Sequence, residues 1–342
     1  MKKLRKVIQE HTGKIFPGIV SLVAHKGEIL FFEASGLRSL LPEKVSMTKD
    51  TIFDLASLTK VIATAPSILK LIEDGELTLE DDLGYFFPEL KNNWKGEIRI
   101  LDLLTHSSGF PPYLQPGQET REAYIDKLFR IQKAYERGKQ VVYSCINYIF
   151  LGFIVEKITG ENLSEFTRKH IFEPLGMTDT FFMPPASQRN RIASTEKIGD
   201  QILKGVIHDP AARKLGGISG NAGLFSTAED IHKFALMILN SGAFGDKQIL
   251  RPETIKMMAR RWIEDRGLGF AIKTETNKHF GSYFDENSLC HTGYTGTSLL
   301  IDLKNEIIVI LLTNRVHPED TNKEEFSRFR RIVHNIVAME LL

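Results

Sequence analysis

The stretch Phe53-Asp54-Leu55-Ala56-Ser57-Leu58-Thr59-Lys60-Val61-Ile62-Ala63-Thr64 places a hydroxyl and an amine three residues apart at a predicted helix start. Residues at positions i and i+3 share one helical face, so we expect the Ser57 hydroxyl and the Lys60 ammonium to touch. A serine attacks a carbonyl only when a base within hydrogen-bond reach takes its proton. Lys60 can be that base if burial or a cationic neighbour lowers its pKa. The free N–H groups of a first helical turn also suit an oxyanion at Ser57.

Taken alone, this Ser-x-x-Lys spacing is a weak signal, because both residue types are common. An isolated match is usually no more than a structural helix start, and a motif becomes evidence only in its context. The rest of the chain therefore decides how Ser57 is interpreted.

The composition is that of a globular protein. The chain has 342 residues, of which 42% are hydrophobic and 25% charged, and it can bury a sizeable core. Lys and Arg total 44 against 43 for Asp and Glu, a net charge of +1. Such a balance provides no bulk attraction to nucleic acid or to an anionic membrane, so we expect neither as a partner.

The amino-terminal residues 1–11 begin basic, but Gln9 and Glu10 interrupt them before an apolar segment develops. They predict a short amphipathic helix rather than a signal peptide, and no later stretch has the roughly 18 to 20 apolar residues of a membrane span. We therefore expect a cytoplasmic protein, with export possible if the chain has been trimmed. Two cysteines, Cys145 and Cys290, are too few for a disulfide framework and are interpreted as free thiols.

Both ends of the chain have β character. Residues 18–36 predict a hairpin around a turn at 25–27, and residues 293–314 predict a second hairpin. A long amphipathic helix should follow and lie on the sheet. Its apolar face consists of Phe326, Phe329, Val333, Ile336 and Val337.

The middle of the chain is mostly helical. Pro66 predicts a bend or break in the helix that begins at Ser57. Residues 143–160 predict a buried helix, residues 215–225 form a loop with four glycines, and residues 226–229 resemble a capping box for the helix that follows.

Together these elements predict an α+β fold in which both termini form one antiparallel sheet flanked by helices, with a helical lobe beside it. We expect a single two-lobed domain over residues 1–342. Residues 1–55 and 235–342 would form the α/β lobe and residues 56–234 the helical lobe. An active site would lie in the cleft between the lobes.

Several separated segments resemble, in order, the motifs of one family of serine hydrolases. They are Ser57-Leu58-Thr59-Lys60, Leu103-Leu104-Thr105-His106-Ser107-Ser108-Gly109, Tyr143-Ser144-Cys145, Ala222-Gly223-Leu224-Phe225-Ser226-Thr227 and His291-Thr292-Gly293. The family is the penicillin-binding protein and β-lactamase superfamily. The resemblance is to the branch with class C β-lactamases, D-alanyl-D-alanine carboxypeptidases, family VIII esterases and related peptidases and amidases, and it implies the β-lactamase/transpeptidase-like fold.

The resemblance implies that Ser57 is the acylated nucleophile and that Lys60 and Tyr143 share the proton transfer, with the order of the two left open. A phenol near cations could be held partly ionised and relay the proton to the leaving group. The oxyanion hole would consist of the backbone N–H groups of Ser57 and Tyr294. His291 counts among the catalytic residues. The expected substrate-binding residues are Cys145, Thr292, Gly293 and Asn221.

Two positions depart from the family pattern. Cys145 stands where the tyrosine motif usually has Asn or Asp, and a thiol is a poor hydrogen-bond partner for a substrate amide. His291 stands where the lactamases have lysine, so the fixed charge that would bind a β-lactam carboxylate becomes titratable. Both departures weaken the β-lactamase interpretation, and a histidine at position 291 is compatible with the carboxypeptidase, esterase and amidase branches.

We therefore expect a serine hydrolase that forms an acyl-enzyme on a small ester, amide or peptide-like substrate and requires no cofactor. No His-x-x-x-His or Cys-x-x-Cys spacing suggests a metal site. One alternative is a β-lactamase or a penicillin-binding D,D-carboxypeptidase. A second is a noncatalytic relative that binds or senses a ligand, an alternative motivated by Cys145.

Overall fold

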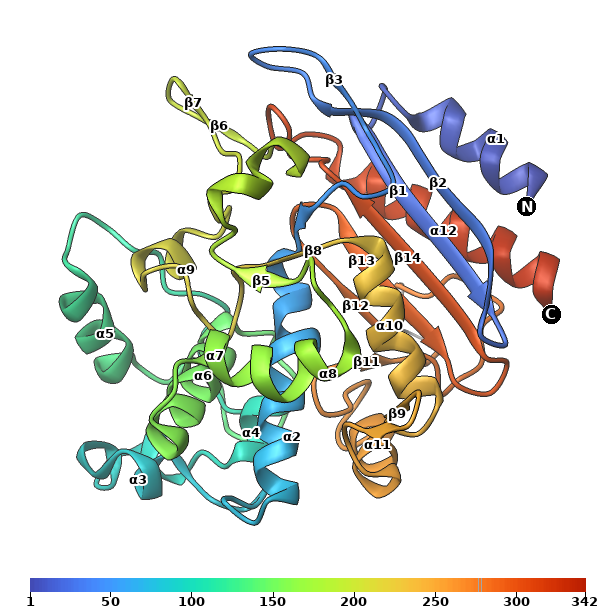
Figure 1. The fold of residues 1–342 in the computed structure, drawn as a ribbon. Helices are drawn as coiled ribbons and strands as arrows, with labels where there is room; N and C mark the ends of the chain where they lie inside the picture. The colour runs from blue at the N-terminus through green and yellow to red at the C-terminus, as the bar shows by residue number, and fades with distance from the viewer. Residues whose placement is uncertain (276, 278) are drawn as a thin grey trace.

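A seven-stranded antiparallel sheet forms the centre of the computed structural model, which describes residues 1–275, 277 and 279–342 (Figure 1). In spatial order the strands are β11 (Ala271–Ile272), β12 (Leu289–Thr292), β13 (Thr297–Asp302), β14 (Ile307–Thr313), β1 (Gly18–His25), β2 (Glu28–Ser39) and β3 (Val45–Ser46). β1 pairs with β14, from Ile19 opposite Thr313 to His25 opposite Ile307. The two predicted hairpins and the sheet built from both termini are confirmed.

Helices cover both faces of this sheet. On one face lie α1 (Lys2–His11) and α12 (Lys323–Leu341), and on the other lies α10 (Ala228–Leu239) (Figure 1). Alternate residues of β1 pack against the helices on the two faces of the sheet, because successive side chains of a strand point to opposite faces. Ile19 and Val23 pack with α1 and α12, whereas Val20 and Leu22 join the cluster that contains α10. The strand is therefore buried on both sides.

Short helices and irregular segments make up the region beside the sheet. The α-helices there are α2 (Ala65–Glu73), α3 (Leu83–Phe86), α4 (Ile100–Leu104), α5 (Arg121–Arg130), α6 (Cys145–Thr159), α7 (Leu163–Thr167), α8 (Glu173–Leu175) and α9 (Pro210–Lys214), while α11 (Pro252–Ala259) lies near the sheet edge. The largest cluster of buried side chains runs from the sheet into this region. The division into lobes at residues 55 and 235 stays a prediction.

Smaller elements complete the fold. The minor strands are β4 (Phe53–Asp54), β8 (Leu224–Ser226) and β5 (Phe181–Phe182) in one sheet, β6 (Lys197–Ile198) with β7 (Gln201–Ile202), and β9 (Ala243–Phe244) with β10 (Lys247–Gln248). The 3₁₀ turns are η1 (Ala56–Leu58), η3 (Pro88–Leu90), η4 (Trp94–Glu97) and η6 (Ala186–Arg191), and the π-helical turns are η2 (Lys60–Thr64) and η5 (Arg168–Phe172). In the described part of the chain, no helix has the length and apolar character to cross a membrane.

The helix expected from Ser57 to Gly75 is divided into three parts. Ser57 lies in the 3₁₀ turn η1, the π-helical turn η2 follows, and α2 begins only at Ala65. Pro66 stands in the first turn of α2, directly after the π-helical turn, and the residues Thr64 and Ala65 before it keep right-handed helical angles. The bend or break predicted from Pro66 is not an interruption of the helical run; the helix type changes before the proline instead.

The glycine-rich loop packs tightly against α6. A Cβ on Gly220 would lie 1.9 Å from the Tyr148 carbonyl oxygen, so this backbone contact requires glycine. The predicted cap of α10 is wrong by one residue. The N-cap is Thr227, whose hydroxyl accepts from the Asp230 N–H at 3.3 Å, because the Ser226 hydroxyl is instead bonded to Thr180 and to the Thr227 carbonyl.

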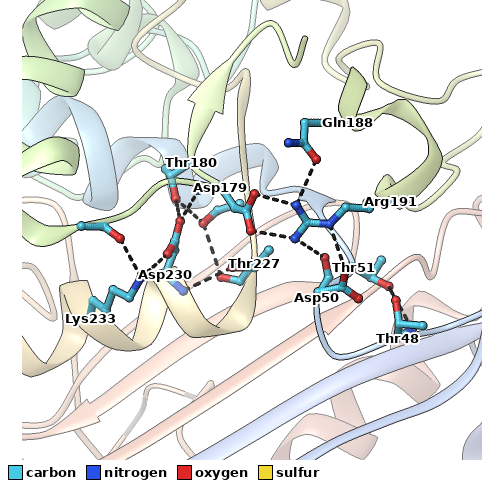
Figure 2. A network of polar contacts seen from close by, with 12 residues as sticks. Thr48, Asp50, Thr51, Asp179, Thr180, Gln188, Arg191, Thr227, Asp230 and Lys233 are labelled. Atoms are coloured by element: carbon cyan, nitrogen blue, oxygen red, sulfur yellow. Dashed lines mark hydrogen bonds and ion pairs between the residues drawn. The ribbon is translucent and has the colours of Figure 1, made fainter. Parts of the chain in front are cut away.

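A polar network fixes the segment that leads into β4 (Figure 2). The Arg191 guanidinium donates to both carboxylate oxygens of Asp179, at 2.7 and 2.6 Å, and to Asp50 at 3.0 Å. Asp230 of α10 accepts from the Asp179 N–H at 2.8 Å and from Thr180 at 2.9 Å. The network therefore joins α10, the segment before β5 and the segment before Ser57, and it holds the start of the candidate site on the scaffold.

Candidate active site

Lys60 is fully buried, with no exposed surface. Its Nζ donates to the Ser57 Oγ at 3.1 Å, to the Asn221 carbonyl oxygen at 2.7 Å and to the Cys145 Sγ at 3.6 Å. The ammonium has three N–H groups, and these three contacts use all of them. The 3₁₀ and π-helical turns thus still bring Ser57 and Lys60 together, as the spacing predicts.

The loop between β12 and β13 holds the Ser57 segment in place. The Thr295 hydroxyl donates to the Asp54 carbonyl at 2.7 Å, and the Thr297 hydroxyl donates to the Leu55 carbonyl at 3.0 Å. A Cβ on Gly293 would lie 2.1 Å from the Thr297 Oγ1 and 2.4 Å from the Leu55 oxygen. Gly293 therefore allows β12 to approach the serine segment closely.

Tyr143 and Cys145 enter the site from the start of α6, where the Ser144 side chain caps the helix by accepting from the Ile146 N–H. The Tyr143 ring lies over the His106 ring, with 4.5 Å between their centroids. The Lys60 Nζ lies 5.2 Å from the Tyr143 ring centroid. The tyrosine and the lysine predicted to share proton transfer are therefore neighbours.

The charge state of this group differs from what the sequence led us to expect. Burial disfavours the ammonium of Lys60, whereas the ionised forms of Cys145 and Tyr143 favour it, and the net direction of the pKa of Lys60 is upward. Burial also raises the pKa of Tyr143, although Lys60 and Ser57 act in the opposite direction. The pKa of the Cys145 thiol is raised by burial as well. The protons of these three groups are therefore coupled, and none of the three pKa values is lowered in the way that a free base beside Ser57 would require.

His291 is neutral, which corrects the idea of a titratable positive charge at this position. It lies on β12, is 5% exposed, and burial together with Lys60 and Arg266 lowers its pKa well below the ordinary value. Neither ring nitrogen has a hydrogen-bond partner among the described residues. The imidazole is thus a buried neutral group with unused hydrogen-bonding capacity, and it carries no charge for a substrate carboxylate.

Tyr294 lies in the loop that follows β12, two residues after the end of the strand at Thr292. Its backbone N–H has no acceptor within the described part of the chain, whereas its carbonyl accepts from Arg315 at 2.7 Å. Its ring is 48% exposed, and its hydroxyl donates to Asp320. The free N–H is compatible with the predicted oxyanion role, which stays a prediction.

Asn221 lies behind Lys60 rather than on the wall of the cavity. Its side chain accepts from the Ser219 hydroxyl at 2.7 Å and donates to the Asp209 carboxylate at 3.1 Å, and the residue is fully buried. What it presents to the site is its backbone carbonyl, which holds the Lys60 ammonium. The sequence placed Asn221 correctly near the site, but a contact between its side chain and substrate would require these bonds to break.

One cavity of about 320 Å³ contains most of the predicted site residues. Ser57, Tyr143, His291, Thr292, Gly293 and Tyr294 line it. The sequence analysis missed four basic residues that also line it, Arg266, Arg315, Lys323 and Arg330. Among the residues that the structure describes, no group of three or more His, Cys, Asp or Glu could hold a metal ion.

The model of the Beta-lactamase family matches residues 4–330 of the chain. A protein of Escherichia coli (strain K12), provisionally named a D-alanyl-D-alanine carboxypeptidase, is 31% identical over 93% of this chain and 82% of its own length. The N-acetylmuramyl-L-alanine amidase of Bacillus subtilis (strain 168) is also 31% identical, over 95% of this chain and 83% of its own.

Solved structures share the fold at lower identity. EstCE1, described as a hydrolase with promiscuous acyltransferase activity, aligns with a TM-score of 0.80 at 21% identity over 97% of both chains. A penicillin-binding protein homologue from Caulobacter crescentus aligns with a TM-score of 0.80 at 19% identity, over 98% of this chain and 97% of its own. The arrangement of sheet and helices is therefore the β-lactamase/transpeptidase-like fold, and the chain belongs to the β-lactamase family of hydrolases.

Proposed function

We propose that this protein is a serine hydrolase that forms an acyl-enzyme on Ser57. The observation that carries the proposal is the 3.1 Å contact between the Lys60 Nζ and the Ser57 Oγ, on a serine that lines a cavity of substrate size. A buried cation beside a hydroxyl stabilises the negative charge that develops on the oxygen during attack. This arrangement therefore supports a nucleophile rather than a helix cap.

In the proposed reaction, the Ser57 oxygen attacks the substrate carbonyl while its proton passes to the pair formed by Tyr143 and Lys60. The same pair then protonates the leaving amine or alcohol as its bond to the carbonyl carbon breaks. Water repeats the sequence on the acyl-enzyme, which releases a carboxylic acid and returns the proton to Ser57. The N–H groups of Ser57 and Tyr294 would bind the oxyanion, and each such donor typically stabilises the transition state by about 2.7 to 4 kcal/mol.

The pair must lose one proton before it can accept one from Ser57. The pKa values of Lys60 and Tyr143 are both raised, so the reactive form is the minor one at neutral pH. In that form the remaining proton resides on either residue, and whichever group is deprotonated acts as the base. We therefore assign the role of general base to the pair of Lys60 and Tyr143, and we predict that the rate of acylation of Ser57 increases with pH.

We propose a small ester, amide or peptide-like molecule as the substrate. The two relatives are named as a carboxypeptidase and an amidase, names that refer to the hydrolysis of amide bonds, and EstCE1 is described as a hydrolase. A β-lactamase is the less favoured alternative, because the neutral His291 replaces the cation of the lactamase motif. A panel of short-chain esters, D-amino acid amides and a chromogenic cephalosporin would test this ranking, and a dominant rate on the cephalosporin would reverse it.

Labelling with a fluorophosphonate probe, followed by intact-protein mass spectrometry, tests the nucleophile. We expect one adduct on the wild type and none on Ser57→Ala. Ser327→Ala is the matched control, because Ser327 lines the same cavity but donates to the Lys323 carbonyl at 3.0 Å. An adduct that persists in Ser57→Ala would refute the assignment. A protein that labels but turns over no ester or amide would support the ligand-sensing alternative.

A further inference from the structure

Residues 103–109, which take no part in the proposed reaction, pack beside the segment that carries Tyr143. The His106 backbone carbonyl accepts from the Val142 N–H at 2.9 Å. The His106 Nδ1 accepts from the Ser144 N–H at 3.1 Å. One residue therefore holds the backbone on both sides of Tyr143.

The His106 ring also supports the phenol ring of Tyr143. Their centroids lie 4.5 Å apart, with 33° between the ring planes. The Tyr148 ring lies 5.1 Å from the same imidazole, and the Tyr148 hydroxyl is itself fixed by donation to the Leu104 carbonyl at 3.0 Å. The ring of His291 is more distant from Tyr143, at 6.0 Å. The imidazole of His106 therefore gives the phenol its closer aromatic contact.

The hydrogen bonds of His106 fix its tautomer. Its Nδ1 lies 3.1 Å from the side-chain nitrogen of Asn147, whose amide oxygen accepts from the Ser108 hydroxyl at 2.5 Å. A ring nitrogen that faces two N–H donors carries no proton, so the proton of the neutral ring is on Nε2. Burial lowers the pKa of His106 well below its ordinary value. The ring is therefore neutral, and its one acceptor stays directed at the segment of Tyr143.

Two features of His106 are unfavourable for folding. Its φ is +59°, in the left-handed region that a residue with a Cβ seldom adopts. Its buried Nε2 has no hydrogen-bond partner among the described residues. Strain of this kind is concentrated at functional sites, where the surrounding structure maintains it. The two costs indicate that the ring contributes to the site as well as to the packing of the loop.

We propose that His106 is a positioning residue that holds Tyr143 in the orientation needed for proton transfer with Ser57. The inference rests on the proposed function, in which Tyr143 and Lys60 form the general base. The two backbone hydrogen bonds fix the place of Tyr143 in the chain, and the ring contact fixes the direction of its side chain. His106 does not line the cavity, so it acts through Tyr143. A misplacement of about 1 Å at a reacting group can lower a rate by about 10²-fold.

Two substitutions separate the acceptor of His106 from its ring. His106→Asn keeps an acceptor near the Nδ1 position, tolerates the left-handed backbone and removes the ring, whereas His106→Phe keeps a ring and removes the acceptor. We expect the rate of fluorophosphonate labelling of Ser57 to fall by about 10- to 100-fold in His106→Phe and by at most about 5-fold in His106→Asn. His106→Gln, whose amide reaches the Nε2 end instead, should resemble His106→Phe and replaces it if that variant does not fold. The reverse order, in which His106→Phe labels faster than His106→Asn, would show a packing role and overturn the inference.

A double-mutant cycle tests whether the effect passes through Tyr143. In a Tyr143→Phe background, His106→Phe should change the labelling rate by less than about 3-fold, because the residue that it positions has lost its hydroxyl. Equal losses in the two backgrounds would overturn the inference.

Ser107→Ala is the matched control, because Ser107 is the next residue of the loop, is buried, and has its hydroxyl bonded to Thr105 at 3.0 Å. It should label within about 3-fold of the wild type even if its Tm falls. A loss in Ser107→Ala equal to that in His106→Phe would show a general effect of the loop and overturn the inference. If the wild type labels and every His106 variant labels at the same rate, this inference fails and the proposed function stands. If the wild type is neither labelled nor active, the proposed function fails and this inference fails with it.

Discussion

Two buried cations, Lys60 and Arg330 of α12, lie on opposite sides of β12, and their surroundings differ. Lys60 has three hydrogen-bond contacts, to Ser57, Asn221 and Cys145, whereas Arg330 has none among the described residues. A cation whose donors are all occupied is held in one position before any ligand arrives, which suits a group that must stabilise charge during a reaction. A buried cation without such contacts leaves the cost of its desolvation without compensation. The same burial thus has different chemical consequences on the two sides.

The largest predicted effect comes from removing the occupied cation. Lys60→Met should lower the rate of fluorophosphonate labelling by about 10³-fold or more, because members of a catalytic unit contribute strongly when removed singly. Arg330→Met should label within about 3-fold of the wild type. Equal losses in the two variants would break the distinction between the two cations.

The second predicted effect is the pH dependence of the labelling rate, which depends on the protonation of Lys60 and Tyr143. Because the pKa values of Lys60 and Tyr143 are raised, the reactive form of the pair should increase about tenfold per pH unit from pH 6 to 9. The labelling rate should follow with a slope near one, and Tyr143→Phe should lower it by about 10²- to 10⁴-fold.

His291→Asn is the control for this pH profile. The pKa of His291 lies well below its ordinary value, so its titration should not contribute between pH 6 and 9. An inflection near pH 6.5 that disappears in His291→Asn would show that His291 titrates in the active enzyme.

The sequence predicted the site residues around Lys60, on one side of β12, better than it predicted the buried Arg330 on the other side. The Ser57 and Lys60 spacing and the Tyr143 motif are local patterns, and the structure brings these residues together as expected. The contact from the Asn221 carbonyl to Lys60 depends on the path of a loop, and composition does not encode that path. The neutral state of His291 depends on burial by distant segments, which a local motif does not reveal.

The signal for Arg330 was present in the sequence but was not used. The apolar stripe of α12 places residues 326, 330, 333 and 337 on one face, and an arginine occupies the second of these positions. A charged residue in an apolar stripe predicts a buried charge, which usually has a partner or a function. The hairpins were easier to predict, because their β-branched runs and turns are continuous in the chain.

The third effect concerns proton uptake on the α12 side. Burial lowers the pKa of His334 to about 3, and the neighbouring Arg330 contributes to this shift. The unfolded chain binds a proton near pH 6.5 and the folded chain near pH 3, so stability is complete above 6.5 and decreases as the pH falls through this window. Between pH 7 and 5 this histidine should account for about 2 kcal/mol of lost unfolding free energy.

Urea unfolding of the wild type and His334→Phe at both pH values measures this contribution. On acidification from pH 7 to pH 5, the unfolding free energy of the variant should fall by about 2 kcal/mol less than that of the wild type. Between pH 7 and 8, the unfolding free energies of the two proteins should change by the same amount. Arg330→Met should lose the same unfolding free energy as the wild type between pH 7 and 5, because this loss is set by the unfolded-state pKa while the pKa of His334 in the folded chain stays far below 5.

The smallest predicted effect tests Cys145. Its Sγ is 3.6 Å from the Lys60 Nζ, and sulfur is a weak acceptor, so two stronger contacts to Lys60 remain without it. Cys145→Ala should therefore retain labelling and ester hydrolysis within about 5-fold. A loss comparable to that of Lys60→Met would instead make the thiol part of the reacting group.

The pairing of β1 with β14 has a consequence for the order in which the molecule assembles. These neighbours in the sheet are separated by almost the whole chain, from Ile19 to Thr313. During synthesis, β1 cannot pair with β14 until β14 has left the ribosome. β12, which carries His291 and Thr292 of the site, joins the sheet through β13 and β14. Contacts of such long sequence separation form slowly. The newborn protein should therefore remain inactive, with exposed strand edges that chaperones can bind, until its final hairpin closes the sheet.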